Sequence, residues 1–202
     1  GGATSIGGLI IDYGTYDWKQ SNKLKPDGIK FGPFAFINRL RREVYRNIGA
    51  CMPPHNAYLQ SLGLETLALR VDVACANTLK LAEFLQKSRV VKSVSYPGLK
   101  DSPYYDIAKK QFGQKAGAVL IFDLASKAEC FKFLNGLKLI RRATNLQDNR
   151  TLVLHPASTI FCEYDDQLKQ EMGVRETMIR LSVGIEDTQD LISDIEQGLE
   201  AL

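Results

Sequence analysis

Cysteine is scarce in this chain of 202 residues, and closely spaced cysteine pairs are absent. The four cysteines are Cys51, Cys75, Cys130 and Cys162, so no C-x-x-C motif occurs. This spacing argues against a zinc site and against a thiol–disulfide motif, because both depend on cysteines a few residues apart. No signal peptide is recognisable, and we therefore expect free thiols in a reducing, cytoplasmic compartment.

Histidine is rarer still, with only His55 and His155. The two lie far apart, and neither has cysteines or carboxylates at metal-ligand spacing, so we expect no metal site. We expect His55 in the first turn of a helix and His155, which precedes Pro156, as a structural residue at a strand end. Cys51 has no evident base beside it, which argues against a nucleophilic cysteine.

Long apolar runs and a strong excess of one charge are also missing. No stretch approaches the roughly 20 residues of a membrane span, and the formal net charge is only +3. Nucleic-acid binding would need a wider basic field with interleaved aromatics. We therefore expect no membrane or nucleic-acid partner, and a solvated or subunit-facing helix surface for the basic group Arg39, Arg41, Arg42 and Arg46.

The chain does contain the apolar content of a globular protein, at 45% hydrophobic and 24% charged residues. Hydrophobic periodicity predicts an α/β pattern of strands followed by helices, packed as a sheet with helices on one face or both. The predicted strands are residues 5–12, 90–96, 118–124, 139–142, 151–154 and 178–183. The predicted helices are residues 34–49, 55–87, 104–112, 127–134, 165–172 and 187–201, with an irregular loop at 13–32.

The helix predicted over 55–87 is long for a globular domain, so we expect it to connect two domains. These domains are residues 1–65 and residues 88–202. The leucines in the first half of the helix are too widely distributed for a single stripe, and we expect them to be buried on several sides.

The most informative segment surrounds Arg180. Ile179, Leu181 and Val183 alternate with Arg180 and Ser182, the pattern of a strand with one apolar face. A guanidinium held on a rigid strand is a good fork for a carboxylate. The alternative interpretation is a half-exposed arginine on an edge strand.

Asn145 lies in a polar loop, residues 144–150, that precedes the strand 151–154. Its amide is a neutral donor that could hold a carboxylate oxygen beside an arginine. The alternative is a turn residue that satisfies the local backbone.

Taken in order, these segments resemble the Cys/Met-metabolism family of pyridoxal-phosphate (PLP) enzymes, and within it most closely the O-acetylhomoserine sulfhydrylases. The resemblance spans essentially all of the chain. The matching motifs are Thr4–Gly8, Gly63–Arg70 with Asn77, Tyr96–Leu99, His155–Thr159 and Ile179–Glu186. The loop 13–32, the segment Pro54–Leu59 and the Asn145 loop are similar to the sulfhydrylase branch.

The resemblance implies the end of the large domain of the fold type I PLP-dependent transferases, residues 1–65, followed by their C-terminal α/β small domain. It implies γ-replacement in methionine biosynthesis, in which a sulfur nucleophile displaces acetate to give homocysteine. Arg180, helped by Asn145, matches the position that binds the substrate carboxylate. It also implies PLP as cofactor, a cytoplasmic homotetramer, and an amino-acid substrate with a sulfur donor.

The same family includes cystathionine γ-synthase and the methionine and cystathionine γ-lyases, which remain alternatives. The family's Schiff-base lysine is expected just before Gly1, and most cofactor-binding residues upstream with it. The chain is therefore expected to be the C-terminal half of an enzyme, inactive without an N-terminal half. A non-enzymatic assembly fragment is the third alternative.

Several positions depart from the family pattern. Gly1–Ala3 lacks a histidine often found in this turn, and Ile160 and Phe161 stand where threonine and histidine are usual. Gln147 stands where glycine is usual, which predicts a differently shaped Asn145 loop.

Overall fold

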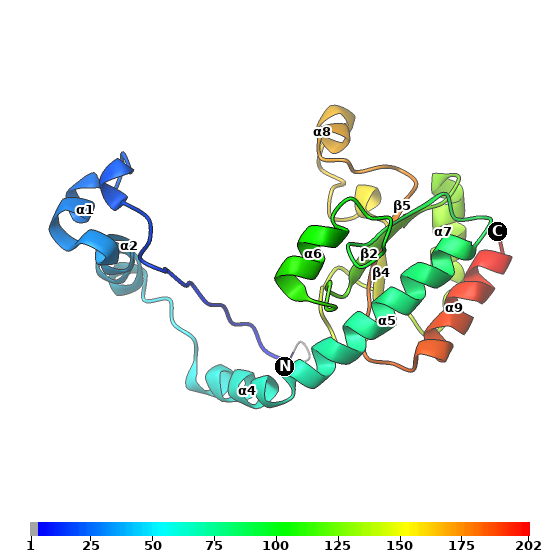
Figure 1. Ribbon diagram of the computed structural model, residues 1–202, viewed down its shortest axis with the longest axis horizontal. Helices are drawn as coiled ribbons and strands as arrows, with labels where there is room; N and C mark the ends of the chain where they lie inside the picture. The colour runs from blue at the N-terminus through cyan, green and yellow to red at the C-terminus, as the bar shows by residue number, and fades with distance from the viewer. Residues whose placement is uncertain (1–3) are drawn as a thin grey trace. The chain divides into compact units, whose positions relative to one another are not determined.

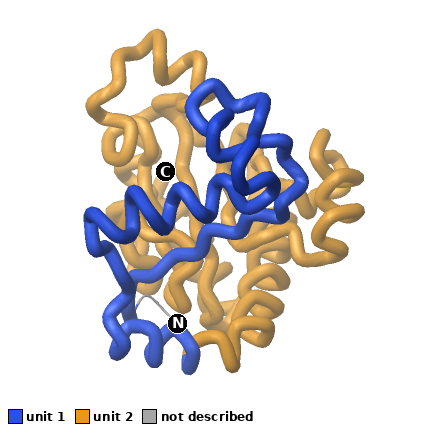
Figure 2. Tube along the Cα trace, turned by 90° about the vertical axis from the view of Figure 1, so that its left-hand side faces the viewer, with its two compact units in different colours: residues 1, 3–62 blue, residues 2, 63–202 orange. Residues whose placement is uncertain are grey.

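The structure, a computed structural model, describes residues 4–202. The expectation about Gly1–Ala3 falls outside the described residues. The chain forms two compact units, which divide between residues 62 and 63 (Figure 2). The predicted domains, 1–65 and 88–202, stay a prediction.

The first unit is a string of short helices (Figure 1). The indole of Trp18 stacks on the ring of Phe36, with 5.2 Å between centroids, and contacts the ring of Tyr16 edge-on. Gly28 packs so closely on the Trp18 backbone that a Cβ would lie 2.6 Å from it. The helices of this unit are η1 (Trp18–Gln20), α1 (Lys25–Phe31), η2 (Gly32–Phe34), α2 (Ala35–Arg39), the π-helix η3 (Leu40–Tyr45), α3 (Arg46–Ile48) and the start of α4 (Pro54–Glu65).

Two expectations for this unit are wrong and one is confirmed. Residues 5–12 form no strand, and Ile6 and Leu9 are about nine-tenths exposed, because a strand needs hydrogen bonds to a neighbour and no described segment supplies them. The supposed loop 13–32 contains two helices, η1 and α1, since Asp17 caps the first through its carboxylate. The helix predicted over 34–49 is present, although it passes through a π-helical stretch.

The long helix predicted over 55–87 is interrupted at Thr66, where φ is −110° and ψ 8°, between α4 and α5 (Leu67–Lys87). Its first-half leucines are not buried within the described chain, contrary to expectation: Leu62, Leu64 and Leu69 are exposed. The wide distribution of these leucines leaves no single apolar stripe, so one neighbouring element could not cover them.

The second unit is built around a five-stranded sheet of strand order β1-β2-β5-β4-β3. All pairs are antiparallel except β3 with β4. The strands are β1 (Ser93–Ser95), β2 (Val119–Asp123), β3 (Arg141–Arg142), β4 (Leu152–Leu154) and β5 (Met178–Ser182). Since β5 lies in the middle, the edge-strand interpretation of Arg180 is wrong.

Three helices cover one face of this sheet: α5, α7 (Lys127–Gly136) and α9 (Thr188–Glu200) (Figure 1). Their apolar residues meet Ile179, Leu181 and Val183 in one core, so the predicted buried face of this strand is confirmed. Asp187 caps α9 by accepting from the amides of Gln189 and Asp190, as its position before the helix predicts. The remaining elements are α6 (Tyr105–Phe112), η4 (Pro156–Ser158) and α8 (Asp166–Glu171).

Candidate functional site

Arg180 lies on the sheet face opposite the three helices, at the centre of β5. In the register it stands between Ile121 of β2 and Leu154 of β4. Strands on both sides therefore fix its Cα, and its side chain is half-buried between two apolar neighbours. A guanidinium in this position is held rigidly at its base, which favours a directed contact.

The guanidinium is only partly satisfied. Its Nη2 donates to the carbonyl of Thr144 at 2.8 Å, whereas Nε is buried and has no hydrogen-bond partner among the described residues. No acidic side chain in residues 4–202 forms an ion pair with it. Burial lowers the pKa of Arg180, because desolvation disfavours its charged form. The half-buried guanidinium thus keeps one donor, Nε, that no described residue uses.

The loop of residues 144–150 is attached to β5 at a second point. The amide of Gln147 donates to the Ser182 hydroxyl at 3.0 Å, and Ser182 lies two residues after Arg180 on the same sheet face. Gln147 itself has a φ of 56°, in the left-handed region that favours glycine. Glycine is usual at this position in the family pattern, and the structure shows a backbone conformation that favours glycine.

Asn145 follows Thr144 directly, so its backbone lies beside the Arg180 guanidinium. Its side chain is exposed and has no recorded partner in the described part of the chain. The structure therefore brings the two predicted residues to one loop–strand junction, but records no direct contact between their side chains. Their predicted roles toward substrate stay a prediction.

A buried polar network, which sequence reasoning missed, holds the end of this loop. The Glu186 carboxylate accepts from the amide and the hydroxyl of Thr151, at 2.6 and 2.8 Å. The Thr151 hydroxyl accepts in turn from the amide of Gly184. A Cβ on Gly184 would lie 2.3 Å from the carbonyl oxygen of Asn149, so only glycine allows the loop to approach this closely.

Asn77 on α5 ties this network to the helical layer. Its amide donates to the carbonyls of Gly184 and Glu186 at 3.2 and 2.8 Å, and its oxygen accepts from the Thr188 hydroxyl. The signal for it in the sequence is a single asparagine within an apolar helix, a residue that would be costly to bury without partners.

His155 is structural, as predicted. It is buried, its Nδ1 lies 2.8 Å from the Ser158 hydroxyl, and its Nε2 lies 2.8 Å from the Glu176 carbonyl. His55 is exposed and is the second residue of α4, in its first turn as predicted. Within residues 4–202, no group of three or more histidine, cysteine or acidic side chains stands where it could hold a metal ion.

A cavity of about 280 Å³ borders the Arg180 junction. It is lined by Thr144, whose carbonyl holds Arg180, by Leu154, the register partner of Arg180, and by His155. Ile160 and Phe161, the two unusual residues, come just after η4. The lining contains no lysine and no acidic residue.

This lining tests whether the chain could hold PLP at the junction. The cofactor needs an amine for its aldehyde, donors for its phosphate and a partner for its pyridine nitrogen. The cavity beside Arg180 supplies neither the amine nor an acidic partner among its lining residues. The lining of this cavity therefore does not fit the cofactor.

Comparison with known proteins gives concordant results. A family profile described as Cys/Met metabolism PLP-dependent enzyme matches residues 1–200. The O-acetyl-L-homoserine sulfhydrylase of Corynebacterium glutamicum is 35% identical over 218 residues, covering 100% of this chain and 50% of that protein. The L-methionine gamma-lyase of Pseudomonas putida is 38% identical over 175 residues, covering 86% and 44%.

The likeness extends to solved structures. An O-acetylhomoserine sulfhydrylase of Wolinella succinogenes, described as catalysing sulfur transfer in the methionine biosynthetic pathway, superimposes with a TM-score of 0.75 at 46% identity. The match covers 92% of this chain and 50% of that one. The chain spans about half the length of the relatives it matches. No helix within residues 4–202 is long and apolar enough to cross a membrane.

Proposed function

We propose, from the premise that this chain belongs to the Cys/Met-metabolism family of PLP-dependent enzymes, that it is the carboxylate-binding portion of an O-acetylhomoserine sulfhydrylase. The reaction replaces the acetate on Cγ of O-acetylhomoserine with a sulfur nucleophile, which gives homocysteine and releases acetate. The sulfhydrylases among its relatives favour this member of the family.

The observation that carries the proposal is the unpartnered Nε of Arg180. Since Thr144 already orients Nη2, the remaining edge of the guanidinium is available to the two oxygens of an α-carboxylate. Fixing the carboxylate also fixes Cα and hence the direction of its C–H bond, which lowers the entropic cost of reaction. Asn145, at the same junction, would add a neutral donor to one oxygen.

The cofactor would be held by residues other than those described at this junction, which supply the substrate-binding part of the site. We therefore include in the proposal an N-terminal half of the same enzyme that carries the cofactor lysine. The assembly is proposed to be a homotetramer in the cytoplasm, and this chain alone would be inactive.

The test compares substrates in the intact enzyme. O-acetylhomoserine with sulfide should yield homocysteine and acetate, while methionine or cystathionine alone should yield no keto acid. Keto-acid release from methionine or cystathionine would instead identify a γ-lyase, whose similarity to this chain is comparable. Cystathionine formation with cysteine as the acceptor would identify a cystathionine γ-synthase.

The non-enzymatic alternative has its own test. If the intact protein, supplied with PLP, turns over none of these substrates, the chain would be an assembly fragment. Binding of O-acetylhomoserine, measured by calorimetry, would then distinguish two cases. An inactive enzyme that keeps the carboxylate site at Arg180 and Asn145 would bind it, and a protein with no substrate site would not.

A further inference from the structure

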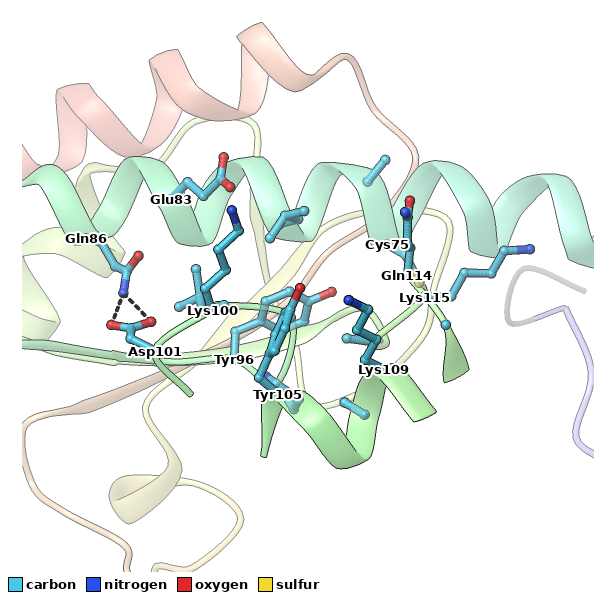
Figure 3. Close-up of a pocket in the computed structure, with 18 of the residues that line it drawn as sticks. Cys75, Glu83, Gln86, Tyr96, Lys100, Asp101, Tyr105, Lys109, Gln114 and Lys115 are labelled. Carbon is cyan, nitrogen blue, oxygen red and sulfur yellow. Dashed lines mark hydrogen bonds between the residues drawn. The ribbon is translucent and has the colours of Figure 1, made fainter. Parts of the chain in front are cut away.

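A second cavity, of about 780 Å³, opens in the second unit away from Arg180 and Asn145, neither of which lines it (Figure 3). Its walls come from α5, from the turn after β1, from α6, and from residues 113–116. Its size is in the range of pockets that bind small molecules. The family reaction proposed above does not use any of these residues.

One side of the cavity is a stripe along α5. Asp72, Cys75, Leu79, Glu83 and Gln86 follow one another at helical spacing. Leu81, Ala82 and Leu85 of the same helix are buried in the core, against which Leu79 also packs. Helix α5 thus contributes to two surfaces, the core and the wall of this cavity.

The floor is apolar and preformed. Cys75, Leu99 and Ala108 are buried, and desolvation raises the pKa of the Cys75 thiol, so the floor carries no charge there. The Tyr96 hydroxyl donates to the carbonyl of Gly117 at 2.9 Å, which fixes the ring. Gly98 packs on that ring so closely that a Cβ would meet it at 2.4 Å.

Charged side chains of both signs surround the rim, and two of them form an ion pair. Lys115 forms an ion pair with Asp72, and the Gln86 amide donates to both oxygens of Asp101 at 2.9 and 3.2 Å. Figure 3 shows the Lys100 amine extended toward Glu83, on the opposite wall.

Lys109 is a lining lysine whose amine lies beside an aromatic ring. The amine is 5.8 Å from the centroid of the Tyr105 ring, and no acidic side chain among residues 4–202 forms an ion pair with it. Figure 3 shows the Lys109 amine beside Tyr105. A cation beside an aromatic ring, above an apolar floor, attracts an anion whose body is flat and apolar.

We propose that this cavity binds a small organic anion with a flat apolar body. The body would pack between the Tyr105 ring and Leu79, and its carboxylate or sulfonate would accept from Lys109. The site is separate from the proposed carboxylate site at Arg180 and Asn145, and it does not depend on the proposed reaction.

The probe is 2-naphthoate, titrated calorimetrically into the intact protein, with the neutral 2-naphthamide as comparison. We expect saturable binding of one naphthoate per chain and at least fivefold weaker binding of the amide. Lys109→Gln should weaken naphthoate binding about five- to tenfold, as loss of one charge-assisted contact does. Lys109→Arg should restore most of it.

Three controls locate the binding. Lys110→Gln changes the neighbouring exposed lysine, which does not line the cavity, and should leave the affinity unchanged. Arg180→Ala should also leave the naphthoate affinity unchanged, which would show that the carboxylate of the probe does not bind at Arg180. Ala76→Trp, which adds a bulky side chain to the cavity wall, should abolish binding while thermal unfolding shows a folded protein.

Equal affinity in the wild type, Lys109→Gln and Ala76→Trp would overturn the proposal. So would a loss of naphthoate binding in Arg180→Ala alone, or no binding at millimolar probe.

Discussion

Arg180 and Thr144, 36 positions apart in the chain, are joined by a hydrogen bond of 2.8 Å from the guanidinium Nη2 to the carbonyl oxygen. The bond places Asn145 at the arginine and leaves Nε of the guanidinium without a partner in the described chain. One backbone carbonyl thus both orients the arginine and brings the second predicted residue to it.

The first prediction concerns this arginine. In the intact enzyme, Arg180→Ala should raise KM for the amino-acid substrate strongly and cost about 2–4 kcal/mol in kcat/KM, as loss of a charge-assisted bidentate contact does. Arg180→Lys keeps the charge but not the fork, and should recover only part of the loss. Steady-state kinetics at varied O-acetylhomoserine and saturating sulfide measure both.

The control is Arg141→Ala on β3, which removes an exposed arginine that does not line the cavity beside Arg180. It should leave KM close to the wild-type value. Near-normal kinetics for Arg180→Ala would refute the carboxylate role of Arg180.

The second prediction concerns Ser182, whose hydroxyl accepts from the amide of Gln147. Ser182→Ala leaves that amide without its partner and should lower the free energy of unfolding by about 1–2 kcal/mol. Because the Asn145 loop is then held less firmly, KM should rise severalfold while kcat changes less. Urea unfolding and steady-state kinetics are the measurements.

Ser193→Ala serves as the matched control, since Ser193 is exposed on α9. It should change neither stability nor KM appreciably. If Ser182→Ala lowered stability but left KM untouched, Ser182 would be structural only and the loop would not depend on it.

The third prediction follows from the φ of 56° at Gln147. A non-glycine residue there costs about 1 kcal/mol, which Gln147→Gly relieves, although glycine makes the unfolded chain more flexible. We expect a net gain in unfolding free energy of about 0.5 kcal/mol. Gln114→Gly, at a position without positive φ, should instead lose stability, and a loss of equal size in both variants would contradict the argument.

Sequence reasoning succeeded where local pattern and structure coincide. The family and the α/β fold class are confirmed, and the strand around Arg180 has the predicted buried face because alternation fixes which side chains share a face. His155 is structural, as its position before Pro156 predicted. These are properties of consecutive residues.

Most of the errors concern partners far away in the chain. Alternation cannot show that β5 is central, since strand order depends on which segments pair. Nor can it show that residues 5–12 have no neighbouring strand among residues 4–202, or that Thr151 and Glu186, 35 positions apart, bind each other. The 780 Å³ cavity was missed for the same reason, because its lining comes from four separate segments.

The fourth prediction concerns Asp123 at the end of β2. Its carboxylate accepts from Arg175 Nε and Nη2, from the Ser93 hydroxyl and from the Thr177 hydroxyl, at 2.6 to 2.9 Å. Burial by itself would raise the pKa of Asp123, but the hydrogen bonds from Arg175, Ser93 and Thr177 outweigh it, and the pKa is lowered. The ionised form is therefore the one that stabilises the fold.

A lowered pKa in the folded state means that the unfolded chain takes up the proton first as the pH falls. The stabilisation is thus fully present above about pH 5 and is lost as the pH falls through about 4 and then through the folded-state pKa. We expect Asp123→Asn to reduce stability at pH 7 by about 1–2 kcal/mol, a figure limited by the exposure of Arg175. It should also flatten the decline between pH 5 and pH 3, measured by urea unfolding at each pH.

Arg175→Gln separates the two causes of the shift. It removes the charged donor and leaves burial opposed only by Ser93 and Thr177, so the pKa of Asp123 should rise toward or above its ordinary value. Stability would then fall less, or increase, between pH 5 and pH 3 relative to the wild type. If both variants kept the wild-type pH dependence, the ionised Asp123 would contribute nothing to the acid sensitivity of the fold, and its four hydrogen bonds would have to be equally favourable to the protonated carboxyl.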